Sequence, residues 1–510
     1  MHPYPNSHRW IERGMIALFL ILAFAAGCTP SAPLPTQMSA STPTPLPFPT
    51  ISSSPTSTPT PLPTETNLPA PERPTYTFDV TWDFDVHTVA VDETIVYPNR
   101  TGQPLTSLAL AVQPNVWPEG FTLESFTIDD SLAANYTLEG RRMTLALPRE
   151  LLPGQAVQLS LRYQLALPVI EYVDPTIAGP RIFGYTDLEQ NLANWYPFIV
   201  PFVDGQWVLH EPSFQGEFLV YDAADFDVTL RFADPSSAPV VAASGWAEPG
   251  SESGEMRYSL RSARTFVLSA SRSFQVEQVQ VGEAMIYVYY FPFDHERELE
   301  VRAVSNTVAR SVEIFSETFG AYPHKSLTFV LADFPGSMEY SAFIFYGRGP
   351  DVYFDGTPNN EYVALAAHET SHQWWFDQVG NDPALHPWLD ETLSTYSEHI
   401  YYESASPSSV DHWWWPFRVD MYNPGGYVDA TIYEQLAYRP YVNAVYFQGA
   451  YFLEKARGRM GRETFFAFLR DYYSQQQGKI AVPADFFSLL RQHSTVDMSD
   501  LIAQYFKGTY

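Results

Sequence analysis

The sequence predicts a multidomain β + α/β protein, with an antiparallel β-sandwich first and a mainly helical domain containing a mixed sheet second. Two observations carry this prediction. Apolar and polar residues alternate with a period of two between residues 76 and 278, and the apolar spacing lengthens to three or four residues between 279 and 510. A chain of 510 residues is long enough for two or three domains and needs no disulfide to bury a core.

Residues 1–28 have the pattern of a lipoprotein-type signal peptide. Basic residues near the start are followed by the apolar stretch Met15–Ala26 and by Gly27, directly before Cys28, the only cysteine. Small residues before a cysteine resemble a bacterial lipobox, in which Cys28 becomes the lipidated first residue. An uncleaved signal anchor is the alternative. Both interpretations place the rest of the chain outside the cytoplasmic membrane, in a bacterial cell envelope and attached to the membrane.

Residues 29–75 are predicted to be a disordered stalk, because most of them are Pro, Ser or Thr and very few are charged. Such a composition cannot form a core, and its prolines favour an extended polyproline II backbone. The stalk would separate the folded domains from the membrane.

The first folded domain is predicted over residues 76–278. Phe78, Val80 and Trp82 alternate with polar residues, which indicates a half-buried strand. The same alternation returns over 157–167, and similar runs continue to about Phe274 without a convincing helical pattern. This succession of short strands indicates an antiparallel sandwich.

The second domain is predicted over residues 279–510. Strands are expected at 285–291, 327–331 and 342–346. Between the first two, valines and phenylalanines recur every three or four residues from Val301 to Phe319, which predicts an amphipathic helix. Further helices are expected around His368 and from positions 389, 445 and 463.

The charge balance argues against nucleic acid as a partner. The chain carries 58 acidic and 29 basic residues, a formal net charge of −29, and no compensating Lys/Arg run. A phosphate backbone would be repelled by such a surface.

One motif indicates a catalytic metal site. His368 and His372 are four residues apart, so on a helix both imidazoles face one ion, while Glu369 lies one step round the helix, where it can hold a water molecule. Glu391, nineteen residues after His372, can supply a third ligand from a second helix. Three protein ligands with a fourth position left for water are typical of catalytic zinc, with Glu369 as the general base.

The surrounding residues resemble the aminopeptidase N family of zinc metallopeptidases, the gluzincins, whose motif is HExxH followed by eighteen residues and a glutamate. Gly336-Ser337-Met338-Glu339-Tyr340 is similar to the family's Gly-x-Met-Glu-Asn motif, with Tyr340 in place of Asn. Tyr446-Phe447-Gln448-Gly449 is similar to its Tyr-x-x-Gly segment. The resemblance is strong over 283–510 and weaker over 76–275.

The resemblance implies a saddle-like β domain, a thermolysin-like catalytic domain and a short form that lacks the family's C-terminal helical domain. It also implies one zinc ion per chain, an oxyanion-binding role for Tyr446, and binding of the substrate's free amine by Glu339, with Gly336 and Met338 beside it. It does not assign the β-domain residue that shares amine binding; Gln215 and Glu217 are candidates. For Glu398, orientation of a zinc-binding histidine and a solvated helix carboxylate are both open.

The function expected from these features is that of a membrane-anchored, extracytoplasmic zinc aminopeptidase, which removes N-terminal residues from peptides by zinc-activated water. One alternative is a zinc endopeptidase, because absence of the C-terminal domain would leave the cleft open. A second alternative is a non-catalytic binding module that retains the fold.

Overall fold

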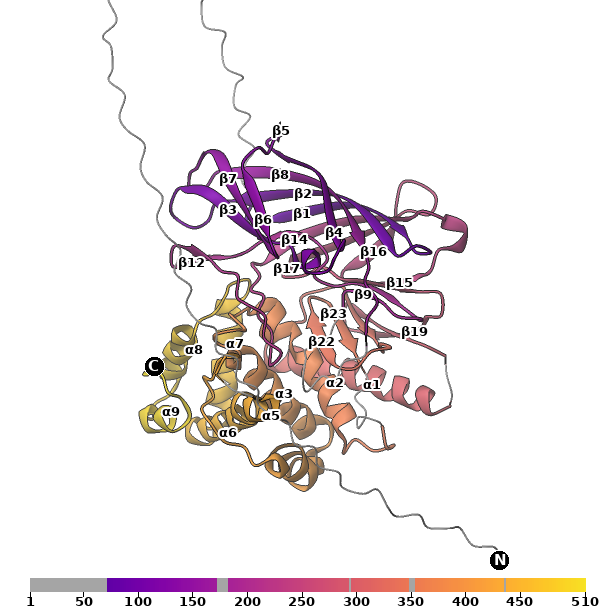
Figure 1. Cartoon of the computed structure of the whole chain (residues 1–510). Coiled ribbons are helices and arrows are strands. Elements are labelled where there is room, and N and C mark those ends of the chain that lie inside the picture. The colour runs from indigo at the N-terminus through magenta and orange to yellow at the C-terminus, as the bar shows by residue number, and fades with distance from the viewer. Residues whose placement is uncertain (1–70, 172–181, 293–294, 348–353, 435–436) are drawn as a thin grey trace, which may run out of the picture. The chain divides into compact units, whose positions relative to one another are not determined.

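The computed structural model of the chain describes residues 71–171, 182–292, 295–347, 354–434 and 437–510 (Figure 1). The predicted signal peptide with Cys28, and nearly all of the predicted stalk, lie outside the described residues. Within these ranges, none of the helices has the length and apolar character needed to cross a membrane.

The first domain is built on an eight-stranded sheet with the order β16-β17-β14-β1-β2-β8-β4-β5. Neighbouring strands are antiparallel except β1 and β14, which run parallel. The strands are β1 (Thr75–Asp83), β2 (Thr88–Pro98), β4 (Phe121–Ile128), β5 (Ser131–Leu132), β8 (Ala156–Ala166), β14 (Ala224–Phe232), β16 (Trp246–Pro249) and β17 (Met256–Ala263).

Three smaller sheets complete this domain, with the orders β11-β3-β7-β6, β15-β18-β10-β9 and β12-β13. Their strands are β3 (Leu105–Ala111), β6 (Tyr136–Glu139), β7 (Arg142–Leu151), β9 (Gly184–Tyr185), β10 (Gln190–Leu192), β11 (Phe198–Ile199), β12 (Phe202–Val203), β13 (Gln206–Trp207), β15 (Val240–Ala243) and β18 (Leu268–Ser271). Two short 3-10 turns, at Gln113–Val116 and Pro235–Ser237, are the helical segments described in this domain.

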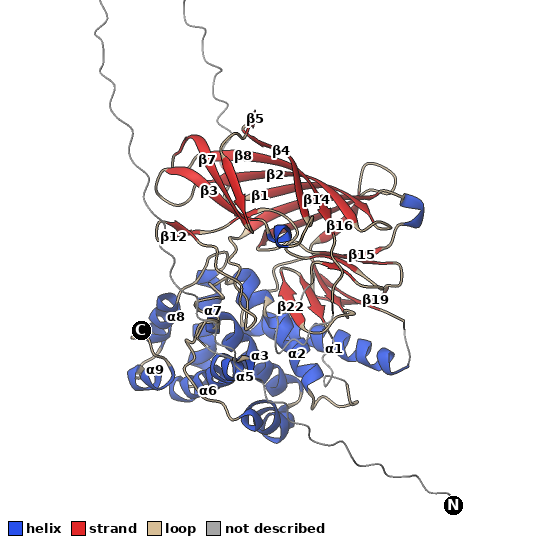
Figure 2. Ribbon diagram, in the orientation of Figure 1, coloured by secondary structure: helices blue, strands red, loops and turns tan. Residues whose placement is uncertain are grey.

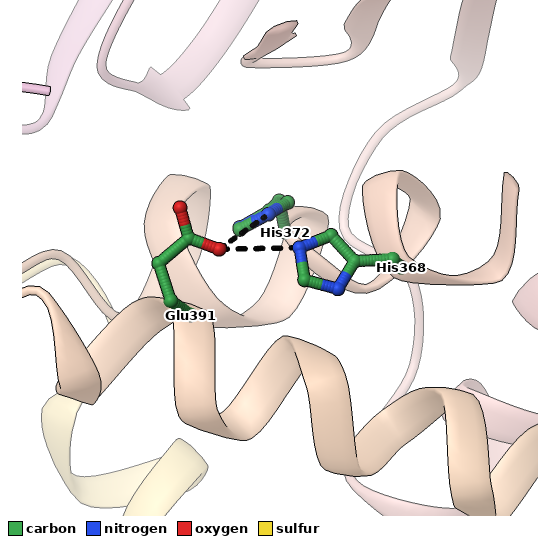
Figure 3. A group of neighbouring side chains, drawn as sticks. All are labelled: His368, His372 and Glu391. Atoms are coloured by element: carbon green, nitrogen blue, oxygen red, sulfur yellow. Dashed lines mark hydrogen bonds and ion pairs between the residues drawn. The ribbon is translucent and has the colours of Figure 1, made fainter. Parts of the chain in front are cut away.

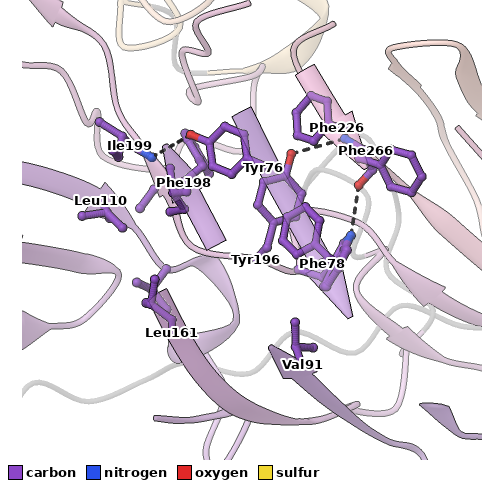
Figure 4. Packing of buried hydrophobic residues seen from close by; sticks show 14 of the residues in the cluster. Tyr76, Phe78, Val91, Leu110, Leu161, Tyr196, Phe198, Ile199, Phe226 and Phe266 are labelled. Atoms are coloured by element: carbon purple, nitrogen blue, oxygen red, sulfur yellow. Dashed lines mark hydrogen bonds between the residues drawn. The ribbon is translucent and has the colours of Figure 1, made fainter. Parts of the chain in front are cut away.

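The domain's core lies between the large sheet and the sheet that contains β3 and β7. Along β1, residues alternate between buried and exposed, as the period of two predicts. Figure 4 shows Tyr76 and Tyr196 among the buried aromatic rings, where each hydroxyl accepts a backbone hydrogen bond, from Ile199 N at 3.2 Å and from Phe266 N at 3.3 Å. The tyrosines therefore provide hydrogen-bond acceptors for backbone N–H groups inside an apolar core.

The second domain begins with a five-stranded sheet of order β19-β20-β21-β23-β22. Its strands are β19 (Gln275–Val281), β20 (Ala284–Tyr290), β21 (Ser326–Val330), β22 (Ser337–Tyr340) and β23 (Phe343–Tyr346). The pairs β20–β21 and β21–β23 are parallel, and the two edge strands are antiparallel to their neighbours. The predicted boundary at 278/279 falls inside β19, so the division lies before Gln275.

Helices make up most of the rest of this domain and lie below the sheets in Figure 2. They are α1 (His295–Thr318), α2 (Glu361–Ser371), α3 (Trp388–Ala405), α4 (Pro407–Ser409), α5 (Tyr438–Val442), α6 (Gly449–Met460), α7 (Arg462–Gln476), α8 (Pro483–His493) and α9 (Ser499–Tyr505). Wider π-helical turns cover Gln373–Gln378, Val410–Val419 and Asn443–Gln448, and Asp420–Tyr422 is a 3-10 turn. Position 445, a predicted helix start, lies inside one of these wider turns, ahead of α6.

Arg264 joins the two domains through its buried side chain. Its guanidinium donates to the backbone oxygens of Tyr221 at 2.7 Å, Phe376 at 2.6 Å and Lys479 at 2.6 Å. Burial lowers the pKa of Arg264 to about 10, which still leaves it charged at neutral pH. One side chain therefore satisfies carbonyl groups from three separate segments.

Replacing Arg264 with Met should destabilise the protein by about 3 kcal/mol or more, because several buried carbonyls lose a charged donor. Arg261→Met is the matched control, since Arg261 is exposed and lies on β17, which ends directly before Arg264; it should cost about 1 kcal/mol or less. Urea denaturation followed by tryptophan fluorescence measures both. Equal losses in the two variants would contradict the joining role of Arg264.

Candidate metal centre

His368, His372 and Glu391 converge at the contact between α2 and α3. Glu391 Oε2 lies 3.1 Å from His368 Nε2 and 3.8 Å from His372 Nε2 (Figure 3). One ligand atom from each of the three residues lies within 4.8 Å of the others. The Asn360 side chain accepts from Val363 N at 3.0 Å and so caps the start of α2, which contains His368 and ends directly before His372.

The other nitrogen of each imidazole is held by a carboxylate. Glu398 Oε1 lies 3.0 Å from His368 Nδ1, and Asp390 Oδ1 lies 2.6 Å from His372 Nδ1. With Nδ1 donating its proton to a carboxylate, each Nε2 keeps a lone pair directed at the shared point beside Glu391.

Glu398 is itself fixed by two donors. Arg418 donates to both of its oxygens, at 2.9 and 2.8 Å, and Trp414 Nε1 donates at 3.0 Å. Burial alone would raise the pKa of Glu398, but the guanidinium of Arg418 holds it below its usual value. Of the two open interpretations of Glu398, the geometry supports contact with a histidine: it is seven residues after Glu391 on α3, on the same helix face.

The donor set fits a zinc ion. Two neutral imidazole nitrogens and one carboxylate oxygen form a common zinc ligand set with an open position. The histidines are nearly fully buried, and the carboxylates at Nδ1 restrain both rings, which is how protein zinc sites orient their ligands.

Glu369 is buried next to this group. Its Oε2 atom has no hydrogen-bond partner among the described residues. Burial raises the pKa of Glu369 to about 7, although the neighbouring histidines act in the opposite direction. A carboxyl with a pKa in this range can both accept and release a proton near neutral pH.

Tyr446 is the tyrosine that the fold brings to the centre. Its hydroxyl donates to Glu391 Oε1, and its ring lies parallel to that of His368, with 5.9 Å between centroids. Burial raises the pKa of Tyr446 well above the usual value, so the hydroxyl keeps its proton. Tyr441 is buried next to Tyr446, whereas the hydroxyl of Tyr451 donates to Asp420 at an exposed position.

Glu339 lies on β22, at the edge of the five-stranded sheet, with Oε1 3.7 Å from His372 Nδ1. Its carboxylate also forms a close group with those of Glu217 and Asp390. Burial, followed by the charge of Glu217, raises the pKa of Glu339 well above its usual value. Burial, followed by the charges of Asp390 and Glu391, raises that of Glu217 to about 8.

Sequence reasoning left Glu217 as one of two candidates and missed Asp390 and Arg418. The position of Asp390, directly before Glu391, was an available signal, because residues next to a ligand often orient the site. Glu217 and Arg418 had no such signal, because they lie far along the chain from the motif.

A cavity of about 700 Å³ opens over this group, and both domains line it. The second domain contributes Gly336, Met338, Glu339, Glu369, Glu391 and Tyr446, and the first contributes Trp117, Phe183, Gln215, Glu217 and Phe218. The structure therefore brings every predicted site residue that it describes into, or directly beside, one cavity of a size suited to a small peptide.

Comparison with known proteins finds a family match within the second domain. Residues 304–505 match the peptidase family M1 domain. Aminopeptidase M1-B from Oryza sativa subsp. japonica is 24% identical over 219 residues, covering 40% of this chain and 25% of the relative. Aminopeptidase N from Streptomyces lividans is 24% identical over 340 residues, covering 62% and 39%. The chain thus spans less than half the length of these relatives.

Solved structures share the fold. The M1 zinc metallopeptidase from Deinococcus radiodurans has a TM-score of 0.60 at 19% identity and covers 86% of this chain and 93% of its own. Legionella pneumophila aminopeptidase A has a TM-score of 0.61 at 14% identity, covering 85% and 49%. The predicted fold class, a sheet-rich domain followed by a mainly helical one, is confirmed by this similarity.

Glu398→Gln should weaken zinc binding by about 10- to 100-fold, because the amide no longer holds His368 as a carboxylate does. Competition with a coloured zinc chelator measures the affinity. Glu403→Gln is the matched control: Glu403 is on the same helix and pairs with Arg457 and Arg462, away from the metal centre. If the Glu398 variant binds zinc as tightly as the control, His368 does not depend on this contact.

Proposed function

We propose that this protein is a zinc aminopeptidase that removes single residues from the N-terminus of peptides, because residues 304–505 match the peptidase family M1 domain. One observation carries the choice of an exopeptidase: the half-buried carboxylate of Glu217 and the buried carboxylate of Glu339 lie directly beside the metal-binding residues. Two mutually repelling carboxylates favour a cation between them, and a peptide's free α-amine supplies one.

His368, His372 and Glu391 hold the zinc ion. When bound, the ion supplies the Lewis acidity that polarises the scissile carbonyl and makes water acidic enough to lose a proton near neutral pH.

Glu369 accepts the proton of the attacking water and passes it to the leaving amine. Its buried Oε2 atom, which has no hydrogen-bond partner within the described part of the chain, is available for both transfers. Tyr446 donates its hydroxyl hydrogen to the substrate oxygen as negative charge develops there, an interaction worth roughly 3 kcal/mol in other enzymes. To do so, the hydroxyl exchanges its bond to Glu391 for one to the substrate.

Glu217 and Glu339 bind the substrate ammonium and so position the first peptide bond at the metal. Peptides as substrates are further supported by a structural neighbour, a variant of the Deinococcus radiodurans enzyme described as bound to Tyr-Ser-Ala substrate. The carboxylates of Glu217 and Glu339 would not help an endopeptidase to bind its substrate, because an internal amide carries no charge.

The zinc-loaded protein should convert a ten-residue peptide into a ladder of products shortened one residue at a time from the N-terminus, as seen by mass spectrometry. Glu339→Gln should lower kcat/KM for free-amine peptides by about 10- to 150-fold, because a charge-assisted contact is lost. N-acetylated peptides should be poor substrates for both forms. Glu369→Gln, which keeps zinc and loses the base, is the control for contaminating activity. Internal fragments without a ladder would instead indicate an endopeptidase.

We also propose that the enzyme works outside the cytoplasmic membrane of a bacterium, tethered through lipidated Cys28. The support is the sequence of residues 1–28, with its apolar stretch and small residues before the cysteine.

Full-length protein expressed in a bacterial host should be recovered with the membranes and carry a metabolically incorporated fatty acid. Cys28→Ala should lose the label, because no other cysteine can replace Cys28. An unlabelled wild type that stays with the membranes would indicate an uncleaved signal anchor in place of a lipid.

A further inference from the structure

Among the residues that the structure describes, the cavity wall is strongly acidic and includes one arginine without a carboxylate partner. Among the described residues that line the cavity, the carboxylates are those of Glu217, Glu339, Glu361, Glu369 and Glu391, and the guanidiniums are those of Arg418 and Arg439. Arg418 is already paired with Glu398, because it donates hydrogen bonds to both carboxylate oxygens. Arg439 makes no ion pair or hydrogen bond within the described chain; its guanidinium lies over the Tyr422 ring, 4.2 Å from the centroid.

Arg439 and the ammonium-binding carboxylates belong to opposite ends of α2. Glu339 lies 3.7 Å from His372, directly after the last residue of α2. The guanidinium of Arg439 stacks on the ring of Tyr422. The Tyr422 hydroxyl donates to Glu361, the first residue of α2, at 2.6 Å. At 1.5 Å per residue, the two ends of this helix are about 16 Å apart. Leu365, on the helix between them, also lines the cavity.

We propose that Arg439 binds the C-terminal carboxylate of a short peptide substrate, of three or four residues. This inference rests on the proposed function, because ammonium binding at Glu217 and Glu339 fixes the other end of the peptide. An extended chain advances about 3.3 Å per residue, so three or four residues with a polar contact of about 3 Å at each end span roughly 16–19 Å.

The chemistry of Arg439 suits a carboxylate. A guanidinium is planar and pairs with both oxygens of a carboxylate, and stacking on Tyr422 restrains it before the ligand arrives. Elsewhere in the cavity, the surrounding carboxylates repel a second negative charge. A short peptide whose carboxylate stays inside the cavity is therefore bound well only where that group reaches Arg439.

The test compares alanine peptides of three, four and eight residues, each as a free acid and as a C-terminal amide. Wild-type kcat/KM should be about tenfold higher for the acid than for the amide at three or four residues, and equal for the two at eight. Arg439→Gln should remove the acid preference and leave the rates on amides unchanged. Arg302→Gln, an identical change at an exposed position on α1 outside the cavity wall, should keep the preference.

A binding measurement makes the result independent of turnover. In a Glu369→Gln background, calorimetry should show that Arg439→Gln raises the Kd of tetra-alanine acid about tenfold and leaves that of the amide unchanged.

Two outcomes would overturn the proposal without touching the aminopeptidase activity. One is a wild type that releases N-terminal residues from acid and amide equally at three and four residues. The other is a preference for the free acid that persists in Arg439→Gln, which would mean that a residue other than Arg439 binds the C-terminal carboxylate of the substrate. If no peptide is cleaved, the proposed function fails, and equal Kd values for the acid with and without Arg439 would then refute this inference as well.

Discussion

The arrangement of the site depends on a group of closely spaced carboxylates, most of them buried, that surrounds two histidines. Glu217, Glu339, Glu369, Asp390, Glu391 and Glu398 surround His368 and His372 where β22, α2 and α3 meet, and Arg418 is the cation that contacts this group directly. Burying a charge without a partner is costly, and the raised pKa values of Glu217, Glu339 and Asp390 express that cost, with burial as the largest cause. A divalent cation at the histidines and an ammonium group at Glu339 would relieve it.

The remaining structure holds these charges at fixed positions. Antiparallel pairing with β23 holds Glu339 on an edge strand. His368 and His372 are four residues apart, so the helical backbone of α2 and of His372 directly after it brings both imidazoles to one face. Asp390 and Glu398 complete the arrangement from α3, and Arg418 then fixes Glu398. Each ligand is therefore oriented by a second residue, which reduces the reorganisation that binding requires.

The β domain is part of the site as well as a neighbour of it. It contributes Glu217 and an apolar wall around Trp117 and Phe183, and Arg264 ties it to the backbone of the helical domain. A cavity between two domains that are joined in this way has one negative end near His372, and Arg439 lies near the start of α2. The charges along the cavity are thus complementary to those of a short peptide with both termini free: carboxylates face its ammonium group, and a guanidinium faces its carboxylate.

The sequence by itself determined the features that depend on local geometry. Alternation of apolar residues along β1 and the helical spacing of His368 and His372 follow from repeats of two or about four residues, which backbone conformation imposes directly. The assignment of Glu391 follows from the resemblance of the sequence to the HExxH-x18-E motif. Only the tertiary structure decided which distant residues join them. The parallel pairing of β1 with β14, the approach of Glu217 to Glu339, and the contact of Arg418 with Glu398 join segments whose proximity no local period encodes. The same holds for Asp390 and Glu391: both are adjacent carboxylates in the chain, and the packing of α3 against α2 directs one to Nδ1 of His372 and the other to the shared metal-binding point.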